Sequence, residues 1–129
     1  MATGTINNPW RVATKEESYP NSAITLTETF RFTRVGNIVF CNYTGNITLD
    51  SNTINQYNTI GEVPAGYRPR ANDWQEKTGN TYVSAAVKGA GRWRVMNTPY
   101  KIYFNGDTTG AQTLYCSLVW YTDEPFPTT

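Results

Sequence analysis

The sequence predicts an all-β fold, an antiparallel jelly-roll-like β-sandwich, on the strength of three observations. No window of the chain repeats apolar residues at helical spacing, and Thr, Val, Ile, Tyr, Gly and Asn dominate instead. Several runs alternate apolar and polar residues with a period of two, which is typical of half-buried strands. Gly, Asn and Pro separate these runs at short intervals. Eight or so short strands without helices favour two packed sheets.

The first half of the chain predicts one hairpin followed by loops. Between Ile24 and Phe32 the even-numbered positions are mostly apolar and the odd-numbered positions polar, so we expect a strand with one buried face. Val35-Gly36-Asn37 predicts a turn, because Gly and Asn tolerate positive φ, and an extended run over 38–43 follows it. Over residues 50–80 the alternation fades, and we expect loops there.

The second half predicts a meander of four strands, over residues 81–88, 92–96, 100–105 and 112–121. Gly89-Ala90-Gly91, Asn97-Thr98-Pro99 and residues 105–110 are expected to be the turns and loops between them. Parity along the strands assigns the following side chains to the core: Val83, Ala85, Val87, Trp93, Val95, Ile102, Phe104, Leu114, Cys116, Leu118 and Trp120. The opposite faces then form a surface that is both basic and aromatic.

Length and composition indicate one domain, residues 1–129. A chain of this size buries roughly two thirds of the surface that it exposes when unfolded. The 9 Tyr, 4 Trp and 5 Phe concentrate that burial in large rings. Cys41 and Cys116 are too few for a disulfide framework, so we expect small buried side chains, with a bridge between two facing strands left open.

Charge and hydropathy exclude two classes of partner. The 11 basic and 10 acidic residues are scattered and leave a net charge of +1, so we expect no nucleic-acid binding. No apolar stretch approaches the roughly 20 residues of a membrane helix, so we expect no membrane insertion. The first residues lack the pattern of a signal peptide, and we expect synthesis in the cytosol.

The chain contains no histidine, which removes the most common general base, His-dependent triads and His-based zinc sites. We therefore expect a protein that is not an enzyme and has no catalytic residue, metal or cofactor. Paired carboxylates could still hydrolyse glycosides, and Asp73, Glu76 and Asp107 fall in loop-rich regions. We interpret them as solvated loop acids.

Exposed aromatic, amide, carboxylate and guanidinium groups are the side chains that sugar recognition requires. An aromatic face stacks on a pyranose ring, and the polar groups hydrogen-bond its hydroxyls. The candidate saccharide-binding residues are Asn72, Asp73, Trp74, Arg92, Arg94, Lys101 and Tyr103. Two structural alternatives stay open: Trp74 closes one end of the core, and the basic strand face is a solvated surface or a subunit interface.

Two segments carry a family resemblance. Residues 30–39 contain the Val35-Gly36-Asn37 turn, and residues 60–69 contain Pro64-Ala65-Gly66-Tyr67-Arg68-Pro69. Together they resemble the β-rich C-terminal domains of tail-fibre and baseplate proteins from phages and prophages of Gram-positive bacteria. The resemblance runs loosely from about residue 30 to 121. The second motif also has a structural explanation, because Pro64 fixes φ and Gly66 supplies an unusual backbone angle.

The resemblance implies a receptor-binding head at the tail tip or baseplate of a virion. Such a head forms a homotrimer, contacts other tail or baseplate proteins and binds a bacterial cell-surface glycan. Residues 1–23 would link the head to its stem or pack beneath it. Receptor-contacting residues vary among such heads, so the resemblance assigns no site residue. Two alternatives are a structural virion or appendage module whose aromatic face is a protein-protein interface, and a glycan depolymerase.

Overall fold

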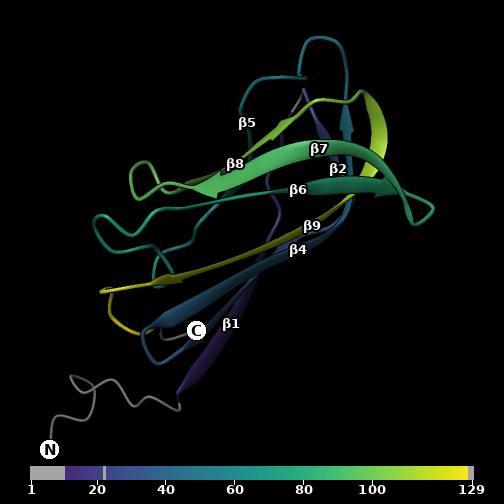
Figure 1. Ribbon diagram of the computed structural model, residues 1–129. Coiled ribbons are helices and arrows are strands. Elements are labelled where there is room, and N and C mark those ends of the chain that lie inside the picture. Colours follow the sequence, from purple (N-terminus) through teal and green to yellow (C-terminus); the bar gives the residue numbers. More distant parts are fainter. Residues whose placement is uncertain (1–10, 22, 128–129) are drawn as a thin grey trace, which may run out of the picture.

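The computed structural model describes residues 11–21 and 23–127, which form strands, turns and loops and no helix (Figure 1). The strands are β1 (Val12–Glu17), β2 (Thr25–Leu26), β3 (Phe30–Val35), β4 (Ile38–Leu49), β5 (Asn58–Glu62), β6 (Gln75–Val83), β7 (Ala86–Val95), β8 (Lys101–Gly106) and β9 (Gly110–Tyr121). The all-β prediction is confirmed.

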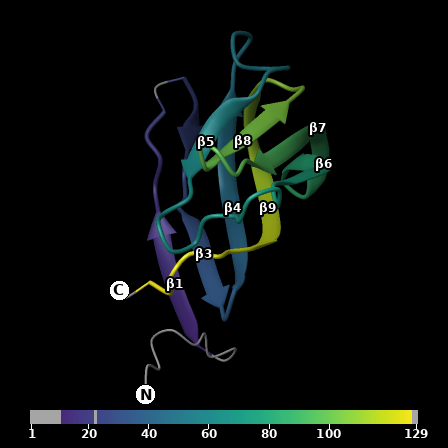
Figure 2. The same ribbon diagram turned by 90° about the vertical axis from the view of Figure 1, so that its left-hand side faces the viewer.

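All strand pairs are antiparallel and belong to one sheet with the order β1-β3-β4-β9-β6-β7-β8-β5, while β2 pairs with β4. The sheet curls around its core into a nearly closed, barrel-like shape (Figures 1 and 2). β6 and β9 are joined by a single residue pair, Tyr82 with Thr113. A hydrogen bond from Thr81 Oγ1 to Gln112 Oε1 (2.6 Å) also joins these two strands, and their junction divides the sheet into two halves, β1-β3-β4-β9 and β6-β7-β8-β5.

Alternation along the long strands decides which side chains enter the core. In β9 the residues from Gln112 to Trp120 alternate between buried and more exposed positions, and β4 pairs with β9 over twelve residues so that its own buried face coincides. Aromatic rings fill the space between strands, with ring centroids 4.9 Å apart for Phe30 and Tyr43 and 6.4 Å for Phe32 and Trp120. Cys41 and Cys116 are both buried free thiols, as small core side chains.

The prediction that three residues, Val83, Ala85 and Val87, belong to the core is wrong. Val83 is 42% exposed and Val87 63% exposed, and Ala85 is exposed as well. They lie in or beside the turn that connects β6 to β7. In this turn Ser84 and Ala85 have positive φ of 50° and 66°. The chain reverses between β6 and β7 at a point where the hairpin extends past the core, so parity there does not point inward.

The predicted turn at Gly89-Ala90-Gly91 is also wrong, because these residues lie inside β7. Glycine serves there for close approach and not for chain reversal: a Cβ at Gly91 would lie 2.5 Å from the Phe104 ring. The predicted loop over 105–110 is shorter than expected, because Asn105 and Gly106 end β8 and Gly110 starts β9. The middle segment, expected to be loops, contains β5 and the start of β6.

One buried arginine joins the two motifs of the family resemblance. Arg34 is fully buried, and its guanidinium donates to the carbonyls of Gly36 (2.8 Å), Gly66 (2.8 Å) and Pro125 (3.1 Å) and to Asn37 Oδ1 (3.1 Å). The Val-Gly-Asn turn and the Pro-x-Gly-Tyr-Arg-Pro turn therefore meet at this side chain. Burial lowers the pKa of Arg34 from its ordinary value.

The C-terminal segment closes the same end of the barrel. Glu124 Oε1 accepts the backbone N–H groups of Gly66 (2.7 Å) and Arg68 (3.1 Å). The Trp120 indole N–H donates to the Tyr67 carbonyl at 2.6 Å. Both resemblance motifs thus have structural roles here.

Candidate functional site

The structure divides the predicted site residues between two places. Arg92 and Arg94 of β7 and Lys101 and Tyr103 of β8 lie on strand positions that alternate with buried ones, and Arg94 is directly opposite Tyr103. These four residues share the outer face of the β7–β8 pair, as parity predicts. Residues 72–74 belong to the loop that leads into β6.

The loop over residues 72–74 is held against the end of β9. Asp73 accepts the Tyr121 backbone N–H on Oδ2 (2.6 Å) and the Gln75 amide on Oδ1 (3.1 Å). Asn72 has a positive φ of 64°. Trp74 is 49% exposed, so the alternative that it closes the core is wrong. Both oxygens of the Asp73 carboxylate therefore accept hydrogen bonds from within the protein. None of residues 72–74 lines the hollow described next.

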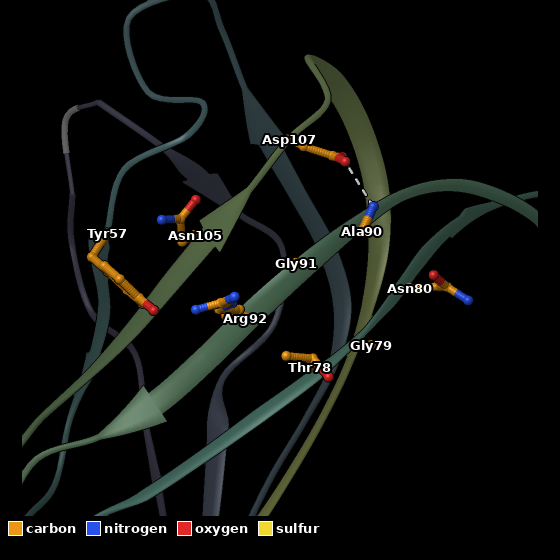
Figure 3. Close-up of a pocket in the computed structure, with 9 residues that line it drawn as sticks. All are labelled: Tyr57, Thr78, Gly79, Asn80, Ala90, Gly91, Arg92, Asn105 and Asp107. Carbon is orange, nitrogen blue, oxygen red and sulfur yellow. Dashed lines mark hydrogen bonds between the residues drawn. The ribbon is translucent and has the colours of Figure 1, made fainter.

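The outer face of β6, β7 and β8 carries a hollow of about 460 Å³, shown in Figure 3. We call it the polar hollow. It is lined by Tyr57, Thr78, Gly79, Asn80, Ala90, Gly91, Arg92, Asn105 and Asp107. β6, β7 and β8 supply most of this lining through outward positions opposite one another, for example Arg92 with Asn105. Tyr57 reaches it from the segment before β5 and points toward Arg92 in Figure 3.

Four polar side chains of the polar hollow have no hydrogen-bonding partner among the described residues. Within the part of the chain that the structure describes, Thr78, Asn80, Arg92 and Asn105 make no side-chain hydrogen bond or ion pair. Asp107 lies at the opposite end of the hollow, where it accepts the Ala90 backbone N–H (3.0 Å) and the Thr108 hydroxyl (2.7 Å). The backbone N–H of Ala90 is the main cause that lowers the pKa of Asp107. The hollow thus offers amide, hydroxyl and guanidinium groups to a ligand.

Tyr57, Glu76 and Arg94 form a fixed bridge across the sheet face. Tyr57 O–H donates to Glu76 Oε2 (2.8 Å), and Arg94 Nε and Nη2 both lie 3.0 Å from the same oxygen. The Arg94 guanidinium also lies 3.7 Å from the centroid of the Tyr57 ring, a cation–π contact. The Tyr57 hydrogen bond, supported by Arg94, lowers the pKa of Glu76. All three groups are therefore held in place by each other.

A second hollow of about 230 Å³ lies on the other side of this bridge. We call it the apolar hollow, and it is lined by Tyr57, Arg94, Met96, Thr98, Pro99 and Tyr103. Tyr57 lines both hollows, so they are neighbours. Of the predicted residues, Arg92 lines the polar hollow and Arg94 and Tyr103 the apolar one, whereas Lys101 lines neither.

The carboxylates considered for glycoside hydrolysis are each engaged in other contacts. Asp73 holds its loop, Glu76 belongs to the bridge and Asp107 binds a backbone N–H. The pKa values of Glu76 and Asp107 are lowered, whereas a general acid in glycoside hydrolysis needs a raised pKa. A third hollow of about 430 Å³ contains two other carboxylates, Glu17 and Glu62.

The described residues contain no cluster of His, Cys, Asp and Glu side chains suited to a metal ion. Within the same part of the chain, no helix is long and apolar enough to cross a membrane. The chain matches no protein-family model, and no curated protein matches it significantly in sequence.

Several residues of the polar hollow escaped the sequence analysis. Tyr57 lies in the irregular middle segment, where no pattern pointed to it. Thr78 and Asn80 are outward residues of β6, which begins at Gln75 and not near residue 81 as predicted. Asn105 ends the predicted strand over 100–105 and starts the predicted loop over 105–110, and its parity with Tyr103 places both residues on the same face of one strand.

Proposed function

We propose that this domain is the receptor-binding head of a phage tail or baseplate, and that it binds a bacterial cell-surface saccharide without transforming it. The observation that carries the proposal is the set of four uncommitted polar side chains, Thr78, Asn80, Arg92 and Asn105, in one open hollow beside Tyr57. Amide and guanidinium groups bind vicinal hydroxyls in directed pairs, and an aromatic ring packs against pyranose C–H groups.

The proposed head is a jelly-roll-like sandwich whose two sheets correspond to the two halves of the curled sheet. The sparse backbone pairing between β6 and β9, which is limited to Tyr82 with Thr113, supports this division into two layers.

The test of saccharide binding uses a glycan array followed by calorimetry on the best ligand. Arg92→Ala and Asn105→Ala should each weaken binding about tenfold or more, because each removes hydrogen bonds in the polar hollow. Arg31→Ala is the matched control: Arg31 is exposed on β3 and lines neither hollow. An array without any binder, obtained with folded protein, would count against the proposal, as would equal losses in the control.

We further propose that the head assembles as a homotrimer in the virion. The outer face of the β1-β3-β4-β9 half of the sheet supports this proposal. Apolar side chains form two adjacent rows on that face, and an assembly would bury them. The members are Val12, Val35, Ile38 and Tyr121 in one row and Phe40 and Val119 in the next. Phe40, Val119 and Tyr121 are 39–48% exposed, and Val12 is 58% exposed. Such a patch is typical of interaction surfaces.

The assembly is tested by sedimentation. The unaltered chain should sediment as a trimer, and the double substitution Phe40→Ser with Val119→Ser should shift it toward monomer without unfolding it. A monomeric unaltered chain at high concentration refutes the trimer. The same patch favours an interface on β4 and β9 over one on the basic face of β7 and β8.

Glycan cleavage is the second candidate, and the presence of Glu17 and Glu62 in one hollow is the observation that favours it. Retaining and inverting glycosidases both need two carboxyl groups that flank the scissile bond. Release of reducing ends from purified host polysaccharide, abolished by Glu17→Gln or Glu62→Gln, would establish cleavage and displace the non-enzymatic proposal.

A further inference from the structure

We propose that the apolar hollow binds the acetamido group of the same saccharide, so that the natural ligand is an N-acetylated glycan that spans at least two sugar rings. This inference rests on the proposed function and names the class of its ligand. It starts from the contrast between two neighbouring hollows on one sheet face. The polar hollow contains four polar side chains without a hydrogen-bond partner among the described residues, whereas the apolar hollow is lined mainly by rings and apolar side chains.

The two hollows lie along one strand. Outward residues of β7 alternate, with Ala90 and Arg92 in the polar hollow and Arg94 in the apolar hollow, and Met96 follows directly after the strand. A strand rises about 3.3 Å per residue, so Arg92 and Met96 are separated by about 13 Å. Linked pyranose rings can cover this distance, whereas a single ring in the polar hollow cannot reach Met96.

The lining of the apolar hollow suits a methyl group beside an amide. Met96, Pro99 and the rings of Tyr57 and Tyr103 give it apolar walls. The Tyr103 hydroxyl makes no hydrogen bond within the described residues, so it can donate to the carbonyl oxygen of an acetamido group. A sugar that carries only hydroxyls has no methyl group to bury against these walls, so it gains less binding free energy there.

The two hollows also differ in the charge that they present to a ligand. Arg94 contributes its guanidinium to the apolar hollow, but Glu76 neutralises it at 3.0 Å and Tyr57 covers one of its faces. Arg92 has no ion pair within the described residues. A neutral acetamido group therefore fits beside Arg94, and the hydroxyl-rich part of the glycan fits beside Arg92.

The bridge of Tyr57, Glu76 and Arg94 keeps the two hollows at a constant spacing. The two hydrogen-bonded contacts and the ring contact within it are already made without a ligand. Binding therefore does not have to order these side chains, which reduces its entropic cost. The spacing between hydroxyl-binding and acetamido-binding positions then selects among linkages.

The experiment compares matched oligosaccharides on one array, each printed as the N-acetyl form and as the free-amine or hydroxyl form of equal length. The best N-acetylated binder and its unacetylated match are then measured by calorimetry against Tyr103→Ser and Arg92→Ala. Tyr103→Ser should weaken the N-acetylated ligand about tenfold, as expected for the loss of one hydrogen bond and one methyl contact. It should leave the unacetylated ligand nearly unchanged, whereas Arg92→Ala should weaken both.

The outcomes distinguish this inference from the function on which it rests. If glycans bind and depend on Arg92 but show neither an N-acetyl preference nor a selective effect of Tyr103→Ser, the acetamido site is refuted and saccharide binding stands. If no glycan binds, both are refuted. Met96→Lys is a second variant that places a cation in the apolar hollow, and it should reproduce the selective loss should Tyr103→Ser not fold.

Discussion

Replacement of Arg34 by Met should destabilise the domain strongly although it adds apolar surface to a buried position. The guanidinium makes four hydrogen bonds from a fully buried position, two of them at 2.8 Å to the carbonyls of Gly36 and Gly66. Methionine keeps an unbranched apolar stem but ends before the position of the guanidinium and has no donor. The substitution therefore leaves buried acceptors without partners at the point where two turns and the C-terminal segment meet.

The expected loss in the free energy of unfolding follows from the number of buried acceptors that lose their donor. A buried polar group that loses its partner costs about 1–3 kcal/mol, so the two short carbonyl contacts alone predict a loss of about 4 kcal/mol. A chain of this size unfolds in urea with a slope of about 2 kcal/mol per M, so the midpoint should fall by about 2 M. Arg34→Lys should also lose stability, because one ammonium cannot reach acceptors on separate segments.

The assay is equilibrium urea unfolding followed by tryptophan fluorescence, with Arg31→Met as the matched control. Arg31 lies on the same strand but is exposed and makes no hydrogen bond or ion pair within the described residues, so its loss should change stability by no more than about 0.5 kcal/mol. Equal midpoints for the two variants would refute the argument that Arg34 joins the turns.

Three further predictions concern the core and the bridge. Gly79→Ala should lower the free energy of unfolding by about 1–3 kcal/mol in a urea titration, because its Cβ would lie 2.4 Å from the Trp93 ring. Burial raises the pKa of both thiols, that of Cys116 to about 12, so a thiol reagent at about pH 8 should label Cys41 and Cys116 only after unfolding; rapid labelling of folded protein would contradict this. The folded pKa of Glu76 is lowered, so it contributes stability above its unfolded pKa of about 4.3 and loses it as the pH falls through the folded value. Glu76→Gln should therefore reduce the acid sensitivity of the urea midpoint, and an unchanged pH profile would contradict this.

The core strands were predictable where apolar and polar residues alternate strongly and where Gly, Asn or Pro marks both ends of the strand. The hairpin turn follows from the tolerance of Gly36 and Asn37 for positive φ, and the buried faces of β8 and β9 follow from their period-two alternation. Glycines misled the prediction in β7, since a glycine that makes room for a ring has the same sequence signature as one in a turn. Only the position of Phe104 against Gly91 separates the two cases.

The candidate site was predictable in part. Parity placed Arg92, Arg94 and Tyr103 on one outer face, and the structure agrees. Tyr57 escaped prediction, because it approaches that face from a segment far away in sequence and is held there by Glu76. The loop at Asn72-Asp73-Trp74 had the right residue types for a sugar site, but Asp73 is occupied by the end of β9.

The sequence by itself determined the all-β class of the structure and the absence of histidine side chains, because side-chain periodicity and composition are properties that folding does not alter. Tertiary structure decided the rest. It buried a charged side chain, Arg34, within the barrel, placed the chain reversal at Ser84 and Ala85, and brought Tyr57 across the sheet to divide one face into two hollows. Each of these depends on contacts between residues distant in the chain, whose energies appear only once the strands are paired.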